Sequence, residues 1–186
     1  MKLICDKEIK NIGFDDLEFG EYENCSFSGC NFSNKDLSQY VFIECSFKSC
    51  DLSNCIINDT SFQDIAFKEC KLIGLSFDNC KDFLLSFSFT DCNLSFSTFQ
   101  KLKLVKTKFI NCNMTECDFY DCNLKEAKIN NCNILGVIFE NTNLFKTDFR
   151  NSYNLMIDIE RNNIKKAKFN FGHTTGLLAK WDVELS

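Results

Sequence analysis

A bulky apolar residue returns at every fifth position along most of this chain. Within residues 24–55 these positions hold Phe27, Phe32, Leu37, Phe42, Phe47 and Leu52. A small or medium side chain, most often cysteine, lies two residues before each of them, and the other positions are mainly Ser, Asn, Asp, Lys and Glu. Self-similarity at a fixed period restricts the fold more than any other sequence feature.

A period of five fits neither an α-helix nor a straight strand. Each step of five advances about 140° around a helix, so no apolar stripe could form. In a straight strand, successive centres of this period would point to opposite faces. A coil that turns a corner every five residues satisfies the pattern. Four such sides make one square turn, and the turns stack through backbone hydrogen bonds about 4.8 Å apart.

The motif itself resembles the pentapeptide-repeat family. Residues 50–54, CDLSN, and 92–96, CNLSF, are good examples of its small-(Asp/Asn)-(Leu/Phe)-x-x unit. The resemblance covers nearly the whole chain and implies an all-β fold, a right-handed quadrilateral β-helix. We expect about eight coils over residues 1–171, followed by a short helix and strand at 172–186 that serve as a C-terminal dimerisation cap.

The inward frame is interrupted near residues 79–84. It runs by fives from Ile12 to Phe77, but the next expected centre is Asp82, which does not suit an interior. The frame resumes two residues late, at Leu84. We interpret residues 79–83 as a small bulge or loop at a corner, too short to be a domain boundary.

The two ends of the chain depart from the repeat. Residues 1–10 are predicted to form a strand that caps the first coil, because solenoids protect their terminal edges. Asn154 places a polar residue in a central slot, so local distortion is expected there. Residues 172–175 are predicted to form a turn in which Thr174 or Thr175 caps a helix over 176–181, followed by a final strand through Val183 and Leu185. His173, in the turn, has no paired nucleophile and is interpreted as structural.

All thirteen cysteines occupy the inward small-residue position of the two frames. We therefore interpret them as small buried hydrophobes. Stacked pairs such as Cys25 and Cys45 are close enough that distance alone does not exclude a disulfide. A zinc site is not expected, because the recurring spacing is C-x-x-x-x-C and the chain has one histidine. No cofactor is expected.

Composition narrows the function classes. The formal net charge is −5 and the pI is about 5.0, which argues against direct binding to nucleic acid or to an anionic membrane through net charge. The N-terminus does not resemble a signal peptide, and no stretch approaches the about 20 apolar residues of a membrane span. The cytoplasm is the expected compartment. An enzyme is not expected, since a filled rod offers no concave pocket with convergent titratable groups.

The frames assign outward residues to sides of the square. We call one of them the acidic side; its inward residues include Leu17, Leu37, Ile57 and Phe77. If the bulge preserves the register, its only outward basic residues are Lys101 and Arg161. Its outward acids, the candidate partner-binding face, are Asp16, Glu18, Asp36, Asp59, Asp78, Asp118, Asp121, Glu140, Asp158 and Glu160. If the corner near Asp82 is taken differently, this side breaks in two.

The next side, the mixed side, changes sign along its length. Its first half carries Glu21, Glu23, Glu44 and Asp64. Its second half carries one acid, Glu126, and six lysines: Lys103, Lys106, Lys125, Lys146, Lys165 and Lys166. This basic half could contact acidic groups of a partner, of a second copy, or of nucleic acid.

A narrower resemblance concerns function. Residues 23–32, ENCSFSGCNF, residues 148–152, DFRNS, and residues 176–183, GLLAKWDV, are similar to segments of the Qnr-type quinolone-resistance proteins and their mycobacterial and albicidin-resistance relatives. The resemblance implies an acidic, DNA-mimicking surface that binds DNA gyrase or topoisomerase IV. It also implies a head-to-head homodimer joined at the C-terminal end through Leu177, Leu178, Trp181, Val183 and Leu185.

Two alternatives remain open at this point. The acidic side could be only the solvated face of a soluble rod, and the chain a structural or scaffold solenoid with another protein partner. The five C-terminal residues could only cap the last coil. The Qnr-type proteins also carry long loops implicated in rescue of the enzyme from the drug, whereas the only candidate insertion here is the two-residue slip near Asp82.

Overall fold

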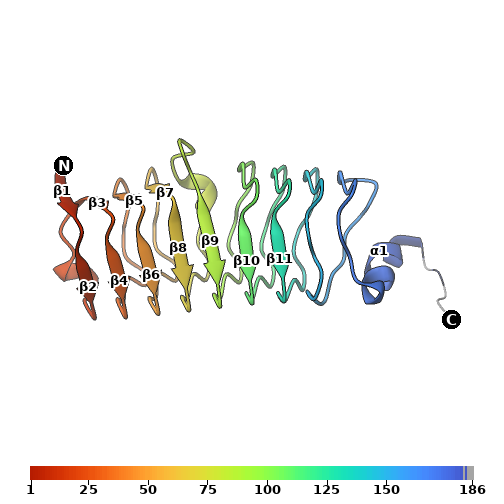
Figure 1. The fold of residues 1–186 in the computed structure, drawn as a ribbon, viewed down its shortest axis with the longest axis horizontal. Helices are drawn as coiled ribbons and strands as arrows, with labels where there is room; N and C mark the ends of the chain where they lie inside the picture. The colour runs from red at the N-terminus through yellow and green to blue at the C-terminus, as the bar shows by residue number, and fades with distance from the viewer. Residues whose placement is uncertain (182, 184–186) are drawn as a thin grey trace.

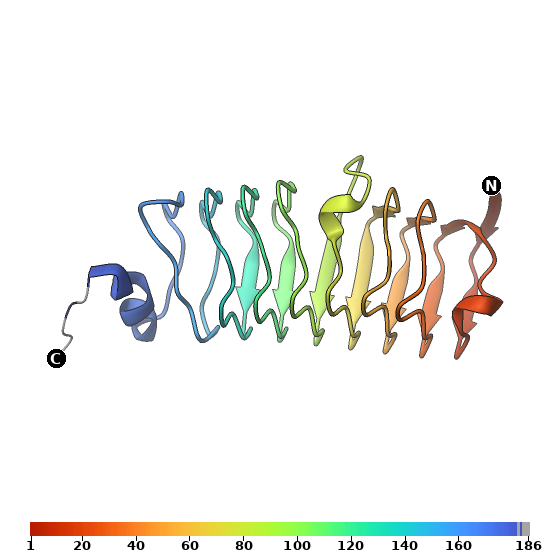
Figure 2. The same cartoon turned by 180° about the vertical axis from the view of Figure 1, so that it is seen from behind.

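The chain forms a long rod of stacked coils with the N- and C-termini at opposite ends (Figure 1). The structure is a computed structural model that describes residues 1–181 and 183. The expected parallel β-solenoid is confirmed. From behind, the coils continue without a break from the N-terminal strands to the short helical segment at the C-terminal end (Figure 2).

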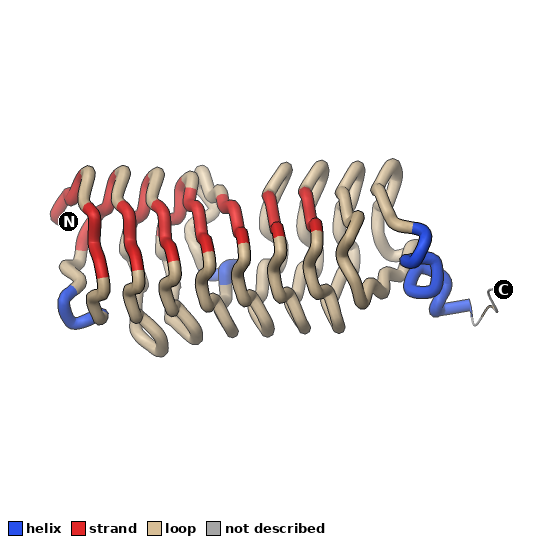
Figure 3. Tube along the Cα trace, turned by 60° about the horizontal axis from the view of Figure 1, so that its bottom comes forward, coloured by secondary structure: helices blue, strands red, loops and turns tan. Residues whose placement is uncertain are grey.

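Two parallel sheets form neighbouring sides of the rod (Figure 3). The four-stranded sheet has the order β1 (Lys2–Cys5), β3 (Gly20–Glu23), β5 (Val41–Ile43) and β7 (Ser61–Gln63). The seven-stranded sheet contains, from the N-terminal end, β2 (Glu8–Lys10), β4 (Ser26–Ser28), β6 (Ser46–Lys48), β8 (Ile65–Lys68), β9 (Phe87–Thr90), β10 (Lys108–Ile110) and β11 (Lys128–Asn130).

The register shows four five-residue sides per coil. Phe27 pairs with Phe47, and Phe109 pairs with Ile129, in each case twenty residues further along the chain. The seven-stranded sheet makes six strand-to-strand steps, so its regular part spans about six turns, slightly fewer than the eight coils expected. Beyond β11 the same column continues only as isolated bridges through Asp148 to Lys168.

The core is a column of stacked aromatic and aliphatic side chains. The rings of Phe27 and Phe47 stack with centroids 4.6 Å apart, and those of Phe99 and Phe119 with centroids 4.8 Å apart. Twelve of the cysteines are buried, Cys5 is half-buried, and all thirteen are free thiols. The inward placement of the cysteines is therefore confirmed, and their thiols donate weak hydrogen bonds to backbone carbonyls, as from Cys117 Sγ to Leu94 O at 3.0 Å.

The corners explain the frequent Asn and Asp residues. The second residue after each inward centre commonly has a positive φ, as at Asn34 (58°), Asn54 (54°) and Asn131 (55°). Asn and Asp tolerate this left-handed conformation better than most residues, and glycine tolerates it best. Gly29 and Gly74 occupy the same corner position.

The first coil differs from the prediction. Residues 1–10 do not form a separate capping strand; β1 and β2 are two sides of the first coil, in register with β3 and β4. This coil is two residues shorter than the regular twenty-residue coil, since Ile9 pairs with Phe27. A 3₁₀ turn, η1 (Phe14–Asp16), follows. The bridge between Gly13 and Asn31 places Phe14, rather than the predicted Ile12, in the central slot.

The slip near residues 79–84 is confirmed as a two-residue insertion, because Phe67 of β8 pairs with Phe89 of β9. After the turn η2 (Phe77–Asn79), the added residues form the loop that projects beyond the other corners in Figure 1. The predicted inward position of Leu84 is wrong: its side chain is 63% exposed, and that of Phe83 is 70% exposed. The interior is filled by Phe87, whose ring contacts Phe62 and Phe77.

Asn154 is an irregularity, as predicted. It is exposed with a left-handed φ of 59°, and Leu155 is buried instead. The Asn154 amide donates to Asn133 Oδ1 at 2.7 Å, which ties the distorted coil to the coil before it.

The C-terminal segment is more helical than predicted. It comprises η3 (Phe171–His173), α1 (Thr174–Leu178) and η4 (Ala179–Trp181), so the predicted turn at 172–175 is wrong. Asn170 and His173, rather than a threonine, form the capping box. His173 is buried and structural: Asn170 N donates to its Nδ1 at 3.3 Å, and its Nε2 lies 2.7 Å from Ser152 O. Val183 is in no strand, and Leu185 lies outside the described residues.

Candidate partner-binding surfaces

The acidic side stays in register across the bulge. Ser76 bridges to Thr98, and Thr98 to Asp118, so the insertion does not rotate the later coils. All ten predicted acids are exposed or half-exposed on this side. The structure therefore brings them together along one length of the rod.

Six of these acids have no ion-pair partner within 4.0 Å among residues 1–181 and 183. They are Asp16, Asp36, Asp59, Asp78, Asp118 and Asp121. Neutral donors orient the side chains of three of them, Asp36, Asp78 and Asp118. Ser38 N donates to Asp36 Oδ1 at 2.8 Å, and hydrogen bonds from the Ser38 hydroxyl and N–H lower the pKa of Asp36. Asp118 accepts a bond from Gln100 Nε2 at 2.6 Å.

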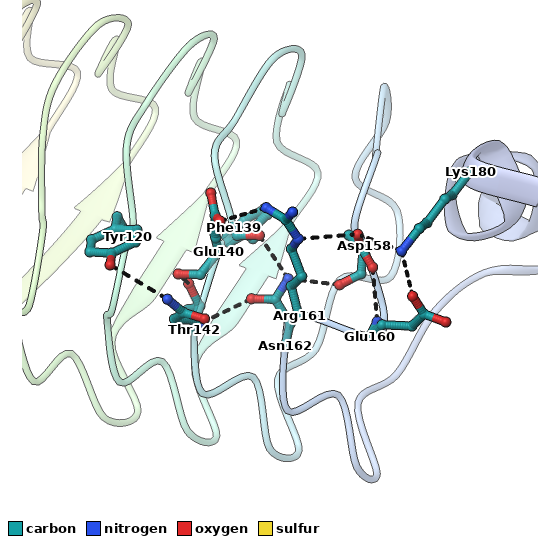
Figure 4. Close-up of polar contacts among 10 residues, drawn as sticks. Tyr120, Phe139, Glu140, Thr142, Asp158, Glu160, Arg161, Asn162 and Lys180 are labelled. Atoms are coloured by element: carbon teal, nitrogen blue, oxygen red, sulfur yellow. Dashed lines mark hydrogen bonds and ion pairs between the residues drawn. The ribbon is translucent and has the colours of Figure 1, made fainter.

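The C-terminal end of the acidic side is internally neutralised (Figure 4). Arg161 Nη1 lies 2.6 Å from Glu140 Oε1, and Lys180 Nζ lies 3.3 Å from Asp158 Oδ2 and also pairs with Glu160. The hydrogen bond that Asp158 accepts from Glu160 N is the main cause of its lowered pKa. The contact with Lys180 lowers the pKa further. The unpaired carboxylates are thus concentrated in the N-terminal and middle coils.

The repeat frames placed Arg161 on the acidic side but gave no position for Lys180. Lys180 belongs to η4, beyond the last repeat, so no repeat frame could assign it to a side. At the other end, Lys2 Nζ pairs with Glu18 Oε2 at 2.7 Å, a contact that also required the three-dimensional arrangement of the first coil.

The bulge forms one wall of a hollow beside the acidic side. The hollow is lined by Asp59, Asp78, Lys81, Asp82, Phe83 and Lys101, among others. An exposed aromatic residue therefore lies next to the unpaired carboxylates of Asp59 and Asp78. The periodic pattern could indicate an insertion here but not the direction in which it projects.

The predicted dimer residues have different environments. Leu177 is partly buried against the core, and Leu178 is half-buried. Trp181 and Val183 are 40% and 49% exposed. Two exposed apolar side chains at the same end were missed, Met156 and Phe171, because the period fails around them.

The six predicted lysines are exposed on the mixed side after the bulge. The bridges Lys103–Asn123 and Asn123–Asn143 keep this part of the side in register. No helix among the described residues is long and apolar enough to cross a membrane. Within the same residues, no group of three or more Cys, His, Asp or Glu side chains is arranged to hold a metal ion.

Comparisons with known proteins agree with this architecture. The model of the pentapeptide repeat region matches residues 20–82 and 62–138. A trypsin-treated variant of QnrB1, a plasmid-mediated fluoroquinolone resistance protein, aligns with a TM-score of 0.66 at 20% identity and 100% coverage of both chains. Full-length QnrB1 aligns with a TM-score of 0.52 at 21% identity, covering 98% of this chain and 99% of its own. A search of curated protein sequences found no significant match.

Proposed function

Because this chain belongs to the pentapeptide-repeat family, we propose that it is a binding protein whose acidic side occupies the DNA-binding surface of a type II topoisomerase, DNA gyrase or topoisomerase IV. The observation that carries the proposal is the unbroken register of the acidic side across the bulge. The proposed role is binding rather than catalysis.

The electrostatics support a DNA mimic. Duplex DNA carries one charge per about 1.7 Å of its axis, and proteins that grip it use Lys and Arg. Coils about 4.8 Å apart give the acidic side a lower charge density than DNA, but the charges lie on a rigid rod. A basic groove would attract such a rod over a distance and orient it along the groove.

The fold of QnrB1 supports the choice of partner class. QnrB1 is a fluoroquinolone resistance protein, and the similarity to it concerns the fold. We extend the proposal to drug protection as its second step. The protective element available in this chain is the short loop bearing Phe83 and Leu84, since no longer insertion interrupts the coils among the described residues.

The test is a gyrase supercoiling assay with the purified protein titrated in, with and without a fluoroquinolone. Inhibition without drug that weakens as salt rises is expected. The combined variant Asp59→Lys, Asp118→Lys and Asp121→Lys should need an at least about tenfold higher concentration for half-inhibition. The reason is that it reverses three unpaired charges. Restored supercoiling in the presence of drug would extend the role to resistance.

The matched control reverses three acids on other sides. Glu69, Asp91 and Glu116 are exposed corner residues, each with φ of 56°. Their replacement by Lys changes the net charge equally but leaves the acidic side intact, so inhibition should change little. Equal inhibition by the wild type and the acidic-side variant would show that the acidic side is not the binding surface.

We also propose a homodimer joined at the C-terminal end. The exposed side chains of Phe171, Trp181 and Val183 provide an apolar surface there, with aromatic residues of the kind that interfaces favour. Replacing Phe171 and Trp181 by Asp should abolish this C-terminal pairing and lower the molecular mass measured by light scattering. A monomeric wild type at high concentration would leave these residues as a cap only.

The second candidate function is a structural scaffold with another protein partner. The mixed side favours it, because a charge reversal along one side has no counterpart in duplex DNA. A pull-down from host lysate that returns no topoisomerase, together with inactivity in the supercoiling assay, would support the scaffold role.

A further inference from the structure

The mixed side is divided into an acidic half and a basic half by the bulge. Before the bulge, its outward acids lie on the coils of β1, β3, β5 and β7, and they are Asp6, Glu21, Glu23, Glu44 and Asp64. After the bulge, the isolated bridges from Lys103 through Asn123 and Asn143 to Asn163 carry the same side to the C-terminal end. This half displays the six lysines named above. The reversal of charge is therefore a property of one continuous side.

These charges are poorly compensated within the chain. Among the described residues, none of the five acids has an ion pair within 4.0 Å. The six lysines share one carboxylate, that of Glu126, which lies 3.7 Å from Lys146 and 4.0 Å from Lys106. Charges of one sign on neighbouring coils repel each other, so each half favours an external partner of opposite charge.

The two halves mirror each other about the bulge. Four coils precede it and four follow it on this side. Asp64 and Lys106 flank it, each two residues after an inward centre, Phe62 and Leu104. At the two ends of the side, Asp6 and Lys166 have this same position after Ile4 and Ile164. Reversing the direction of the rod therefore exchanges Asp64 for Lys106 and Asp6 for Lys166 at matching places.

We propose that the mixed side binds the mixed side of a second copy of this chain, with the two rods antiparallel and the two-fold axis at the bulge. A two-fold interface is self-complementary, since each contact occurs twice. In this arrangement the acidic half of one copy faces the basic half of the other. Asp64 then faces Lys106 and Asp6 faces Lys166 at the same position of the coil, whereas Glu44 and Glu23 face the coils that bear Lys125 and Lys146. Glu126 is the one acid that these coils add to the basic half.

Apolar side chains between the charges support the same arrangement. Val105 is 44% exposed, and Val41 and Ile43 are half-buried on β5. The half-buried ring of Phe145 lies under the ammonium groups of Lys125 and Lys146, at 5.8 and 5.3 Å. Near the axis, Phe83 and Leu84 of both copies would lie close together. An interface of this length between two copies would bury roughly 1,000 Å² of surface in total. Such an area corresponds to a weak, salt-sensitive dimer.

A second copy fits this side better than a polyanion does. Nucleic acid laid along the mixed side would contact the six lysines but would also meet the five carboxylates of the first half. The second copy offers the opposite sign to both halves at once. This interface differs from the C-terminal one in the residues that form it, so the two can be tested separately.

The decisive measurement is zero-length carbodiimide cross-linking of a mixture of ¹⁴N- and ¹⁵N-labelled protein, read by mass spectrometry. Within one chain, Asp6 and Lys166 lie eight coils apart, about 38 Å, so they cannot be joined directly. Mixed-label cross-links between Asp6 and Lys166 and between Asp64 and Lys106 are expected. Cross-links confined to the C-terminal end, or none between copies, would overturn the proposal.

Charge-swap variants supply the independent test by sedimentation. The variant Lys106→Glu/Lys146→Glu should raise the dissociation constant of the mixed-side dimer at least about tenfold, because it brings like charges together. The variant Glu23→Lys/Asp64→Lys should do the same. Mixing the two variants should restore dimers. A matched mixture, in which the added lysines replace Glu8 and Glu69 on other sides, should not restore them.

Two further controls separate the competing explanations. A Trp181→Asp variant should keep the mixed-side cross-links, whereas their loss would assign them to C-terminal pairing. Duplex DNA should not shift the wild-type protein in a gel at physiological salt. A shift that the Lys106→Glu/Lys146→Glu variant abolishes, combined with a monomeric wild type, would overturn the proposal in favour of nucleic acid.

Discussion

The rings of Phe77 and Phe99 stack with centroids 4.6 Å apart and planes 9° apart, although twenty-two residues rather than twenty separate them. The two added residues therefore leave the rod through the loop that bears Phe83 and Leu84, and they do not displace the next coil. This stack keeps the inward centres of the acidic side in one column. The bridges from Ser76 to Thr98 and from Thr98 to Asp118 keep Asp78 and Asp118 on that same side.

Phe87 fills the interior space that the bulge leaves unoccupied. Its ring centroid lies 5.7 Å from that of Phe62 and 5.1 Å from that of Phe77, and its side chain is 5% exposed. Phe87→Ala should lower the free energy of unfolding by about 3–5 kcal/mol, because it removes a buried ring and leaves a cavity. Urea denaturation is the measurement.

The control for this prediction is Phe83→Ala in the same loop region. Phe83 is 70% exposed, so its removal should change the free energy of unfolding by less than about 0.5 kcal/mol. Equal effects of the two substitutions would contradict the packing role of Phe87.

Asp148 makes stability depend on pH. Arg150 donates to it from Nε at 3.0 Å and from Nη2 at 2.8 Å, and these bonds lower the pKa of Asp148 from 3.8 to about 2. A lowered pKa stabilises the folded state above about pH 4, and this contribution is lost as the pH falls toward 2. Asp148→Asn should cost about 1 kcal/mol at pH 7, after allowance for solvent screening at the exposed Arg150.

The measurement is urea unfolding of the wild type and the variant at pH 7 and at pH 2.5. The difference in unfolding free energy should be present at pH 7 and should largely disappear at pH 2.5. Asp64→Asn, at an exposed acid without an ion pair among the described residues, serves as the control and should show no such change. A difference for Asp148→Asn that is the same at both pH values would contradict the ion pair.

The buried thiols should be unreactive in the folded protein. Burial raises the pKa of Cys45, Cys55, Cys117 and Cys122 to about 12. Because the thiolate is the reactive form, a thiol reagent such as DTNB at pH 8 should modify at most the half-buried Cys5. All thirteen cysteines should react after unfolding in guanidinium chloride. Rapid reaction of several thiols before unfolding would contradict their inward placement.

Asn162 holds the last coils together by three hydrogen bonds. Its Nδ2 donates to Phe139 O at 2.7 Å and to Asp158 O at 2.9 Å, and its Oδ1 accepts from Thr142 N at 2.9 Å. Asn162→Ala would leave these backbone groups without partners in a buried site. We expect a loss of about 3 kcal/mol in the free energy of unfolding.

Asn163→Ala is the neighbouring control. Asn163 is exposed and donates one side-chain bond to Asn143 Oδ1 at 3.0 Å, so its loss should cost under about 1 kcal/mol. Thermal unfolding followed by circular dichroism compares the two variants. A larger effect at Asn163 would contradict the role given to Asn162.

The repeat itself was predictable from the sequence because inward and outward positions are local properties of each five-residue side. Phe27 and Phe47, the cysteines and the length of the slip all follow from that periodicity, and the structure confirms them. The same frame assigned the ten acids to one side, subject to the path of the chain at the bulge.

The tertiary structure decided the points at which the period fails. Phe87 replaces Leu84 in the interior because the loop turns outward, and Phe14 replaces Ile12 because the first coil is two residues shorter. Lys180 of η4 reaches Asp158 because the helical segment at the C-terminal end packs against the last coil. These contacts join residues outside the repeat to residues within it, and a periodic pattern carries no information about how such segments meet.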